Sequence, residues 1–332
     1  MAWRRPRYPK GDGIATVLPL FPTEDSFRTR LATRLAELKS LGVWMGTSSW
    51  KYEGWMGQVY TEQRYSARGR FSQKKFEAEC LSEYAEVFPT VCGDFSFYQF
   101  PSALYWSRLF GAAPREFRFA VKAPEDITAK VFPAHSRYGA RAGKTNPSFL
   151  DAELFGRAFA EQLRPFASQV AVVIFEFGAF SRQAMTSLDE FLERLEPFLG
   201  SLPAEFRYAV EIRNPEYLEP AYFDCLRTHK VAHTFNAWTR MPDIGAQIRL
   251  PGAFTADFTV VRALLRRGRT YEQAVKAFAP YREIRDPNPG AREAIREIIR
   301  RVRAHGQEAY IYVNNRLEGN APGTIEAILE GL

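Results

Sequence analysis

Eight short apolar stretches recur along the chain, and a pattern typical of an amphipathic helix follows most of them. Residues 170–177 (VAVVIFEF) are largely apolar at successive positions, as in a strand buried on both faces of a parallel sheet. In residues 208–215 (YAVEIRNP), Glu211 and Arg213 would share one face of a strand with Ala209. Alternating strands and helices predict an α/β fold, and eight strands predict a (β/α)8 TIM-type barrel, which takes roughly 250 residues.

The elements can be placed along the sequence. The eight strands are expected at residues 43–50, 91–98, 117–122, 170–177, 208–215, 231–236, 258–262 and 309–314. Helices are expected at residues 25–41, 74–88, 104–110, 151–166, 188–198, 220–229, 271–281, 291–305 and 323–332. The first helix precedes the barrel and follows a proline-rich arm at residues 1–22. We therefore divide the chain into an N-terminal arm and helical extension, residues 1–42, and a barrel domain, residues 43–332.

An open, doubly wound sheet is the alternative fold. Such a sheet usually has a glycine-rich phosphate-binding turn after its first strand. This chain has GTSSW at that point, and it contains no P-loop, HExxH or GxSxG motif. The motifs therefore favour the barrel.

Charge and composition limit the partners. The chain of 332 residues has a formal net charge of +7, which favours anionic partners such as phosphates, nucleotides or nucleic acid. Its three cysteines and four histidines lack the number and spacing of a disulfide framework or a metal site. We therefore expect no metal, no cofactor and a reducing, cytoplasmic location. No segment approaches the ~18 consecutive apolar residues of a membrane span, so no membrane partner is expected.

Several strand-end motifs also resemble those of one protein family. GTSSWKYEGWMGQVY, FSFYQFP, FRFAVKAPEDIT, AVEIRNPEYL, VVR and YVNNRLEGNAP resemble, in order, signatures of the YecE-like barrels (domain of unknown function 72). The similarity runs from about residue 43 to residue 332. The resemblance implies a TIM-type barrel and no established activity.

The chain departs from the family pattern at three places. Cys92, Gly93 and Asp94 stand where the family usually has a glutamate and an asparagine before the second-strand phenylalanine. Ala129 follows the third-strand threonine, where a histidine is frequent, and Asn236 replaces a usual aspartate at the end of the sixth strand.

In a TIM-type barrel the site lies at the C-terminal ends of the strands, within the loops that follow them. The three longest loops here follow the first, third and seventh strands, and long loops in compact domains are often functional. Polar residues gather at the same strand ends. The candidate catalytic residues are Lys122, Glu176 and Glu211. The candidate substrate-binding residues are Ser49, Trp50, Tyr52, Asp94, Arg213, Asn236, Arg262, Asn314, Asn315 and Arg316.

Each group admits two interpretations. Lys122 could be a Schiff-base nucleophile with a lowered pKa, or it could form a salt bridge with Glu176 or Glu211. The two glutamates could act as the carboxylate pair of a glycosidase, or each could be neutralised by Lys122 or Arg213.

The same holds for the other candidates. Arg213, Arg262 and Arg316 could fork onto a phosphate or carboxylate, or they could form structural pairs with Asp94, Glu176 and Glu211. The rings of Trp50 and Tyr52 could stack on a base or sugar, or they could pack within a loop over the barrel mouth.

Our hypothesis is an enzyme that acts on a small anionic substrate, such as a phosphorylated sugar or a nucleotide. Three arginines would hold the anion, Glu176 or Glu211 would serve as general acid or base, and Lys122 would stabilise charge. One alternative is a non-catalytic nucleic-acid-binding protein, supported by the net charge, the basic loops and the aromatic run after the first strand. A barrel that serves as a scaffold for a partner protein is the third interpretation.

Overall fold

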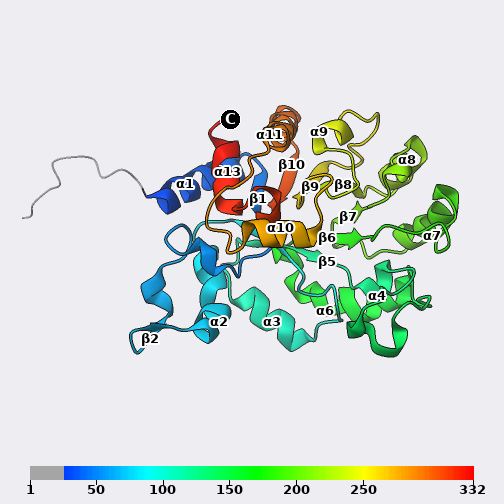
Figure 1. Cartoon of the computed structure of the whole chain (residues 1–332). Helices are drawn as coiled ribbons and strands as arrows, with labels where there is room; N and C mark the ends of the chain where they lie inside the picture. Colours follow the sequence, from blue (N-terminus) through cyan, green and yellow to red (C-terminus); the bar gives the residue numbers. More distant parts are fainter. Residues whose placement is uncertain (1–25) are drawn as a thin grey trace, which may run out of the picture.

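The computed structural model describes residues 26–332, and the predicted arm at residues 1–22 lies outside them. Within the described residues, eight parallel strands close into a barrel in the order β1-β10-β9-β8-β7-β6-β5-β4 (Figure 1). The barrel strands are β1 (Val43–Thr47), β4 (Thr90–Gly93), β5 (Arg118–Lys122), β6 (Val170–Glu176), β7 (Tyr208–Glu211), β8 (Ala232–Ala237), β9 (Phe258–Ala263) and β10 (Glu308–Val313). The predicted (β/α)8 barrel is confirmed, and the open sheet is excluded.

Three strands end at least three residues earlier than predicted. β1, β4 and β7 stop at Thr47, Gly93 and Glu211, several residues before the polar ends of the apolar runs. Some apolar residues beyond them remain buried, such as Phe95 and Ile212. The apolar pattern in the sequence indicates which residues are buried. Buried residues continue past the last strand hydrogen bonds, so the pattern predicted strands that are too long.

Helices surround the ring. The longer ones are α1 (Phe27–Ser40), α2 (Gln73–Tyr84), α3 (Ala103–Gly111), α7 (Leu188–Gly200), α8 (Pro220–Thr228), α10 (Tyr271–Phe278), α11 (Pro289–Ala304) and α13 (Ala321–Leu329). The predicted helix at residues 151–166 consists of α5 (Ala152–Phe155), a π-helical turn over Gly156–Ala160 and α6 (Glu161–Leu163), and a 3₁₀ stretch (Arg164–Gln169) follows it. Short helices α4 (Glu125–Thr128), α9 (Ile244–Gln247) and α12 (Asn315–Glu318) follow strand ends. A two-stranded hairpin, β2 (Ser66–Ala67) and β3 (Arg70–Phe71), lies in the loop after β1.

The N-terminal extension packs on the outside of the barrel. Ser26 caps α1 by accepting a hydrogen bond from the Thr29 amide at 3.2 Å. Leu31 and Leu35 are buried on the inner face of this helix, which contacts β1. Figure 1 shows α1 beside α13, the last helix of the chain. These two helices, the first and last of the described residues, therefore lie together near the seam where β1 meets β10.

Two apolar layers give the barrel its core. Ala209, Ile174 and Tyr312 belong to a cluster inside the ring. Val210 and Phe175, the next residues along their strands, belong to a larger cluster between the strands and the helices. This alternation confirms the predicted faces of the strand at residue 208, and it directs the side chain of every second residue towards the barrel axis.

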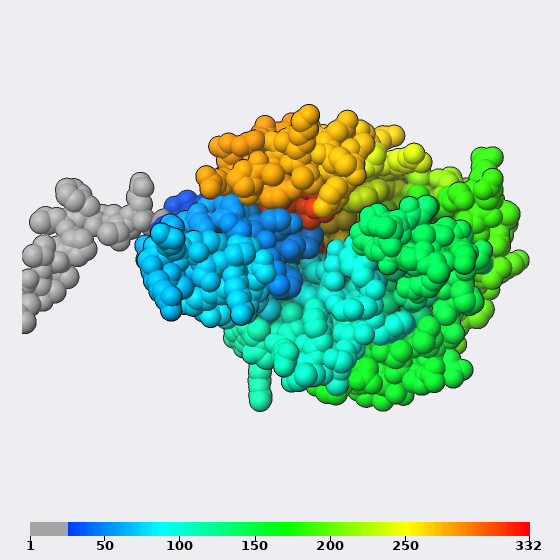
Figure 2. All heavy atoms as spheres, turned by 60° about the horizontal axis from the view of Figure 1, so that its bottom comes forward, coloured from blue at the N-terminus to red at the C-terminus, as the bar shows by residue number. Residues whose placement is uncertain are grey.

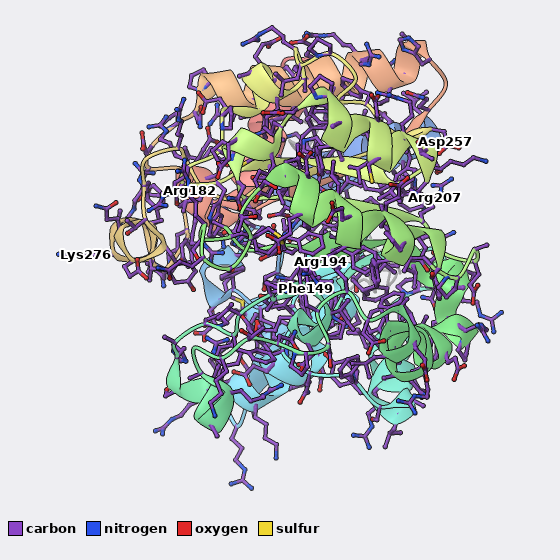
Figure 3. All side chains as sticks on the ribbon, turned by 90° about the vertical axis from the view of Figure 1, so that its right-hand side faces the viewer. Phe149, Arg182, Arg194, Arg207, Asp257 and Lys276 are labelled. Carbon is purple, nitrogen blue, oxygen red and sulfur yellow. The ribbon has the colours of Figure 1, made fainter. Side chains whose placement is uncertain are left out.

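The two ends of the barrel are distinct. Figure 3 shows Arg207 and Asp257, which precede β7 and β9, on one side of the molecule. Arg182 and Lys276, which follow β6 and β9, lie on the opposite side. Figure 2 shows that the surface is hollowed where segments coloured blue, green and orange meet. The three long loops after β1, β5 and β9 carry these colours, so they surround the C-terminal mouth.

Candidate functional site

A cluster of alternating charges fills the C-terminal end of the barrel. Lys122 ends β5, Glu176 ends β6 and Glu211 ends β7, while Arg262 lies in β9 and Arg213 follows β7. Glu176 Oε2 accepts hydrogen bonds from Lys122 Nζ at 3.0 Å and from Arg262 Nη1 at 2.6 Å. Glu176 Oε1 lies 2.7 Å from Arg213 Nη2. The Glu176 carboxylate therefore contacts three cations from three different strands or strand ends.

Glu211 lies deeper than Glu176 in the same cluster. Its carboxylate contacts Arg262 Nη1 and lies 3.1 Å from Arg213 Nη2. Register places the Cα atoms of Glu176 and Glu211 opposite each other on neighbouring strands. The guanidinium of Arg262 hydrogen-bonds to both carboxylates, so it bridges the pair. Lys122 has a second partner in Asp94, whose Oδ1 lies 2.5 Å from Lys122 Nζ.

Burial and charge oppose each other at these residues. Burial alone would raise the pKa of Glu176, but Arg213, Lys122 and Arg262 outweigh it and hold the pKa well below its usual range. Burial would lower the pKa of Lys122, but Glu176 and Asp94 raise it above its usual value. Glu176 and Lys122 therefore carry full charges at neutral pH.

These charges favour the ion-pair interpretations. A Schiff-base lysine must lose its proton, and Lys122 is held protonated by two carboxylates. The Lys122 partners in the structure are Asp94 and Glu176 rather than Glu211. A glycosidase needs one carboxyl that keeps a proton, whereas Glu176 is held ionised and shares Arg262 with Glu211.

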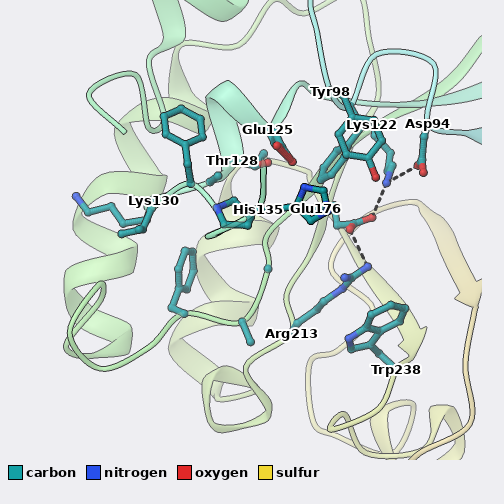
Figure 4. A pocket seen from close by; sticks show the side chains of 18 of the residues that line it. Asp94, Tyr98, Lys122, Glu125, Thr128, Lys130, His135, Glu176, Arg213 and Trp238 are labelled. Carbon is teal, nitrogen blue, oxygen red and sulfur yellow. Dashed lines mark hydrogen bonds and ion pairs between the residues drawn. The ribbon is translucent and has the colours of Figure 1, made fainter. Parts of the chain in front are cut away.

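A cavity of about 760 Å³ opens directly above this cluster. Seven of the predicted site residues line it: Asp94, Lys122, Glu176, Arg213, Arg262, Asn314 and Arg316. Its walls also carry the aromatic side chains Phe97, Tyr98, Phe132, Tyr138, Phe180, Trp238 and Tyr271. Figure 4 shows Lys122, Glu176 and Arg213 joined by ion pairs at one side of this cavity. The volume is within the range of about 300–1,000 Å³ that is common for small-molecule sites.

The other predicted site residues do not line the cavity. Glu211 lies beneath it, fully buried. The Asn236 backbone is held by the side chain of Gln247, whose Nε2 donates to the Asn236 carbonyl at 2.6 Å. Asn315 Oδ1 accepts hydrogen bonds from Trp55 Nε1 at 3.2 Å and from the Ala321 amide at 2.7 Å.

The predicted site residues at and just after the end of the first predicted strand also pack away from the cavity. The carbonyl of Ser49 accepts a hydrogen bond from Thr47 Oγ1 at 2.6 Å. The Trp50 ring packs 5.3 Å from the ring of Phe95, measured between centroids. The Tyr52 ring packs between other aromatic rings of the loops, at 4.9 Å from Trp55 and 5.3 Å from Tyr281. These contacts fit the loop-packing interpretation of Trp50 and Tyr52.

The described part of the chain has neither a candidate metal site nor a candidate membrane-spanning helix. Among residues 26–332, no group of three or more histidine, cysteine or acidic side chains could hold a metal ion. Within the same residues, every helix is too short or too polar to cross a membrane.

Comparison with known proteins supplies the family. The family described as "Protein of unknown function DUF72" matches residues 44–332. The chain belongs to the DUF72 family. The predicted resemblance to YecE-like barrels is thereby confirmed, and none of the curated proteins matches the chain.

Solved structures of other DUF72 proteins share the fold. A DUF72 family protein from Thermotoga maritima MSB8 is 21% identical, with a TM-score of 0.57, over 87% of this chain and 98% of that chain. A DUF72 family protein from Enterococcus faecalis V583 is 15% identical, with a TM-score of 0.56, over 87% of this chain and 95% of that chain. At these identities the likeness shows the barrel architecture alone.

Sequence reasoning missed several residues of the DUF72 cavity. Trp238, just after β8, lies beneath the Arg213 guanidinium, 3.9 Å from ring centroid to the guanidinium carbon. Arg316 lies in the same way over Tyr271 at 4.4 Å, and Arg137 over Tyr98 at 4.5 Å. Three arginine guanidinium groups thus lie over aromatic rings around one cavity, at distances typical of cation–π contacts.

The loop after β5 supplies the remaining wall. Glu125, Lys130, His135, Arg137 and Tyr138 line the cavity from this loop. Its length and its basic residues were the available sequence signals, but neither indicates which side chains turn inward. Hydrogen bonds within the loop, such as the Asn146 amide to the Lys130 carbonyl at 3.0 Å, fold it back over the mouth.

Proposed function

We propose that this DUF72 protein is an enzyme that binds a small anionic metabolite, a phosphorylated sugar or a nucleotide, in the cavity at the barrel mouth. The observation that carries the proposal is the position of Arg316. Its guanidinium lines the cavity over Tyr271, and its Nε is buried without a hydrogen-bond partner among the described residues. The described groups around it are tyrosines, Tyr52, Tyr271 and Tyr281, rather than carboxylates.

Charge balance around the cavity supports an anionic ligand. Lys122, Arg213 and Arg262 are matched by the carboxylates of Asp94, Glu176 and Glu211. Arg316 has no ion pair with any carboxylate of residues 26–332, and Arg137 and Lys130 on the opposite loop have none either. The lining therefore has an excess of positive charge, which attracts anions into a cavity with low-dielectric walls.

The walls favour a ligand that combines this charge with a flat or ring-shaped body. Trp238 and Tyr98 are partly exposed and line the cavity beside Arg213 and Arg137. Aromatic faces beside guanidinium groups suit the stacking of a base or a sugar ring. In this arrangement Arg316 binds the phosphate or carboxylate, with Arg213 beside it.

The buried charge cluster then has an electrostatic role. Glu176 and Glu211 hold Arg213 and Arg262 in fixed positions, and Lys122 presents a permanent positive charge to the cavity. Fixed charges of this kind stabilise negative charge that develops on a substrate. Because Glu176 stays ionised, we assign it this positioning role in place of the acid–base role that its sequence position suggested.

Calorimetric titration with ribose 5-phosphate and with adenosine monophosphate tests the proposal. Loss of a charged hydrogen bond weakens binding by about tenfold or more, so we expect Arg316→Ala to reduce the affinity by that factor. Arg303→Ala removes the same charge from the exposed C-terminal turn of α11, and it should bind as the wild type does. Equal binding by both variants, or no binding of either compound to the wild type, would contradict the proposal.

Nucleic-acid binding without catalysis is tested in parallel by a gel shift at several salt concentrations. Contacts to many phosphates make affinity fall steeply as salt increases. We expect no shift of single- or double-stranded DNA or RNA at low salt, because the excess cations line a cavity of single-metabolite size. A salt-sensitive shift would favour the nucleic-acid interpretation.

A further inference from the structure

A third carboxyl group, besides those of Asp94 and Glu176, lines the same cavity without joining the ion-pair cluster. Glu125 is the first residue of α4, directly after the strand-end motif FRFAVKAP. It is 5% exposed and lines the cavity. Its amide donates to the Phe97 carbonyl at 2.8 Å, which anchors the turn. Its Oε1 is buried and has no hydrogen-bond partner among the described residues.

The groups around Glu125 come from three elements. The hydroxyl of Tyr138, in the 3₁₀ turn over Ser136–Arg141, lowers the pKa of the carboxyl group. Arg137 of the same turn and Lys122 of β5 act on it through their charges, and Asp126 of α4 opposes them. No ion pair closer than 4.0 Å joins Glu125 to a lysine or arginine of residues 26–332. The Oε1 atom is therefore buried without a partner, and the other carboxyl oxygen is the one that a ligand in the cavity can reach.

Glu125 and Glu176 thus line one cavity, but their surroundings shift their pKa values in opposite directions. Burial raises the pKa of Glu125, because it outweighs the lowering by Tyr138, Arg137 and Lys122. Three adjacent cations instead hold the pKa of Glu176 well below its usual range. In active sites, carboxyl groups with pKa values displaced in opposite directions commonly divide the proton-transfer and electrostatic roles between them.

We propose that Glu125 is a catalytic residue of this cavity, the group that gives a proton to the bound anion's reacting oxygen and takes it back. This inference rests on the proposed function. The O–H bond of the Glu125 carboxyl group breaks as an O–H bond forms on the substrate, and the electron pair stays on Glu125. The resulting carboxylate is stabilised by the Tyr138 hydroxyl and by the charge of Arg137. The reverse transfer restores the starting state, so no other reactant is needed.

The arrangement also narrows the substrate class. Figure 4 shows Glu125 on the wall formed by α4 and the loop that follows it. Arg213 and Trp238 come from the loops after β7 and β8. A substrate that reaches both walls needs an anionic group at one end and a hydroxyl or carbonyl oxygen at the other. Phosphorylated sugars have both.

Inorganic sulfate is a suitable probe, because it keeps two negative charges throughout the pH range of the test. In the wild type, sulfate affinity should fall by about tenfold as pH rises through the pKa of Glu125, since the ionised carboxylate repels the dianion across the cavity. Glu125→Gln imitates the protonated carboxyl, so its affinity should stay at the level of the wild type at low pH. Titration calorimetry at several pH values measures the sulfate affinity of the wild type and of Glu125→Gln.

Two further variants separate Glu125 from its neighbours. Tyr138→Phe removes the hydroxyl that lowers the pKa of Glu125, so the inflection should move to higher pH. A purely structural role of Tyr138 would leave the inflection in place. His135→Gln removes the imidazole that lines the same cavity, and it should leave the Glu125 inflection unchanged.

The outcomes distinguish this inference from the proposed function. Sulfate binding with the same pH dependence in the wild type and in Glu125→Gln would overturn the role of Glu125 and leave the anion site intact. Wild-type protein that binds no sulfate at any pH would overturn the anion site, and the role of Glu125 with it. Thermal unfolding monitored by circular dichroism verifies that each variant is folded under the conditions of the titration.

Discussion

Lys122 Nζ lies 3.0 Å from Glu176 Oε2, and this contact joins neighbouring strands β5 and β6 at the mouth of the barrel. The same carboxylate also contacts Arg213 and Arg262. Both Lys122 and Glu176 are almost fully buried. Charges in such surroundings depend on each other, because the loss of one leaves its partners uncompensated in a low-dielectric interior.

Glu176→Gln is therefore expected to destabilise the protein strongly. Breaking a buried ion pair by removal of one partner costs about 3–5 kcal/mol, and we expect the free energy of unfolding to fall by this amount in guanidinium titrations. The matched control is Glu293→Gln, which removes an exposed carboxylate paired with Arg296 and Arg300. Exposed pairs contribute little, so the control should resemble the wild type. A similar change in both variants would mean that the cluster does not stabilise the barrel.

Glu176 should also contribute to the acid sensitivity of the fold. Its pKa is held below the value of about 4.3 that a glutamate has in an unfolded chain. The ionised side chain therefore stabilises the folded state above that pH, and this contribution is lost as pH falls through the lowered value. Between pH 7 and pH 3, the free energy of unfolding should fall less for Glu176→Gln than for the wild type. Parallel pH profiles would show that other carboxylates account for the acid sensitivity.

Tryptophan fluorescence can establish which aromatic wall meets the ligand. Trp238 lines the cavity beneath Arg213, whereas Trp50 packs on Phe95 outside it. Adenosine monophosphate should change the fluorescence of the wild type and of Trp50→Phe, and the change should largely disappear in Trp238→Phe. A signal that is lost in Trp50→Phe instead would restore the ligand-stacking interpretation of the first loop.

Closure of the barrel should be sensitive to one glycine in β1. A Cβ atom added at Gly46 would lie 1.9 Å from the Thr90 carbonyl oxygen, at the seam between β1 and β4. Backbone must move to admit it, so we expect Gly46→Ala to destabilise the protein by about 1–3 kcal/mol or more. Gly111→Ala, at the end of α3 with open space around it, should be neutral or stabilising. Urea unfolding of the two variants gives the comparison, and equal stability would contradict the tight seam.

The direction of side chains was predictable where the backbone is a regular strand. Alternation around residue 208 predicted that Glu211 shares a face with Ala209, and Ala209 lies in the cluster inside the barrel. Alternation cannot predict depth, because depth depends on how far each strand extends past its neighbours. Arg213 lines the cavity, whereas Glu211, two residues earlier, is fully buried beneath it.

Side chains in loops were harder to predict. Trp50 and Tyr52 have the composition of a stacking platform, yet their rings pack against Phe95, Trp55 and Tyr281. Tyr281 is more than 200 residues away in the sequence, in the loop after β9. Contacts between loops that follow different strands depend on the closed ring, which local patterns do not describe.

Glu125 also shows which properties a local sequence pattern predicts and which depend on the folded chain. By itself the sequence determined the eight strands, the helices between them and the end of the barrel at which polar residues gather, because side-chain periodicity is a local property of the backbone. In sequence Glu125 is one of two acidic residues in the first turn of a short helix, where negative charge is ordinary. Only the tertiary structure buried it beside Tyr138 and surrounded Glu176 with three cations. Burial and charge pairing arise when distant segments meet, so the proton affinities of these two carboxyl groups were decided by the folded chain.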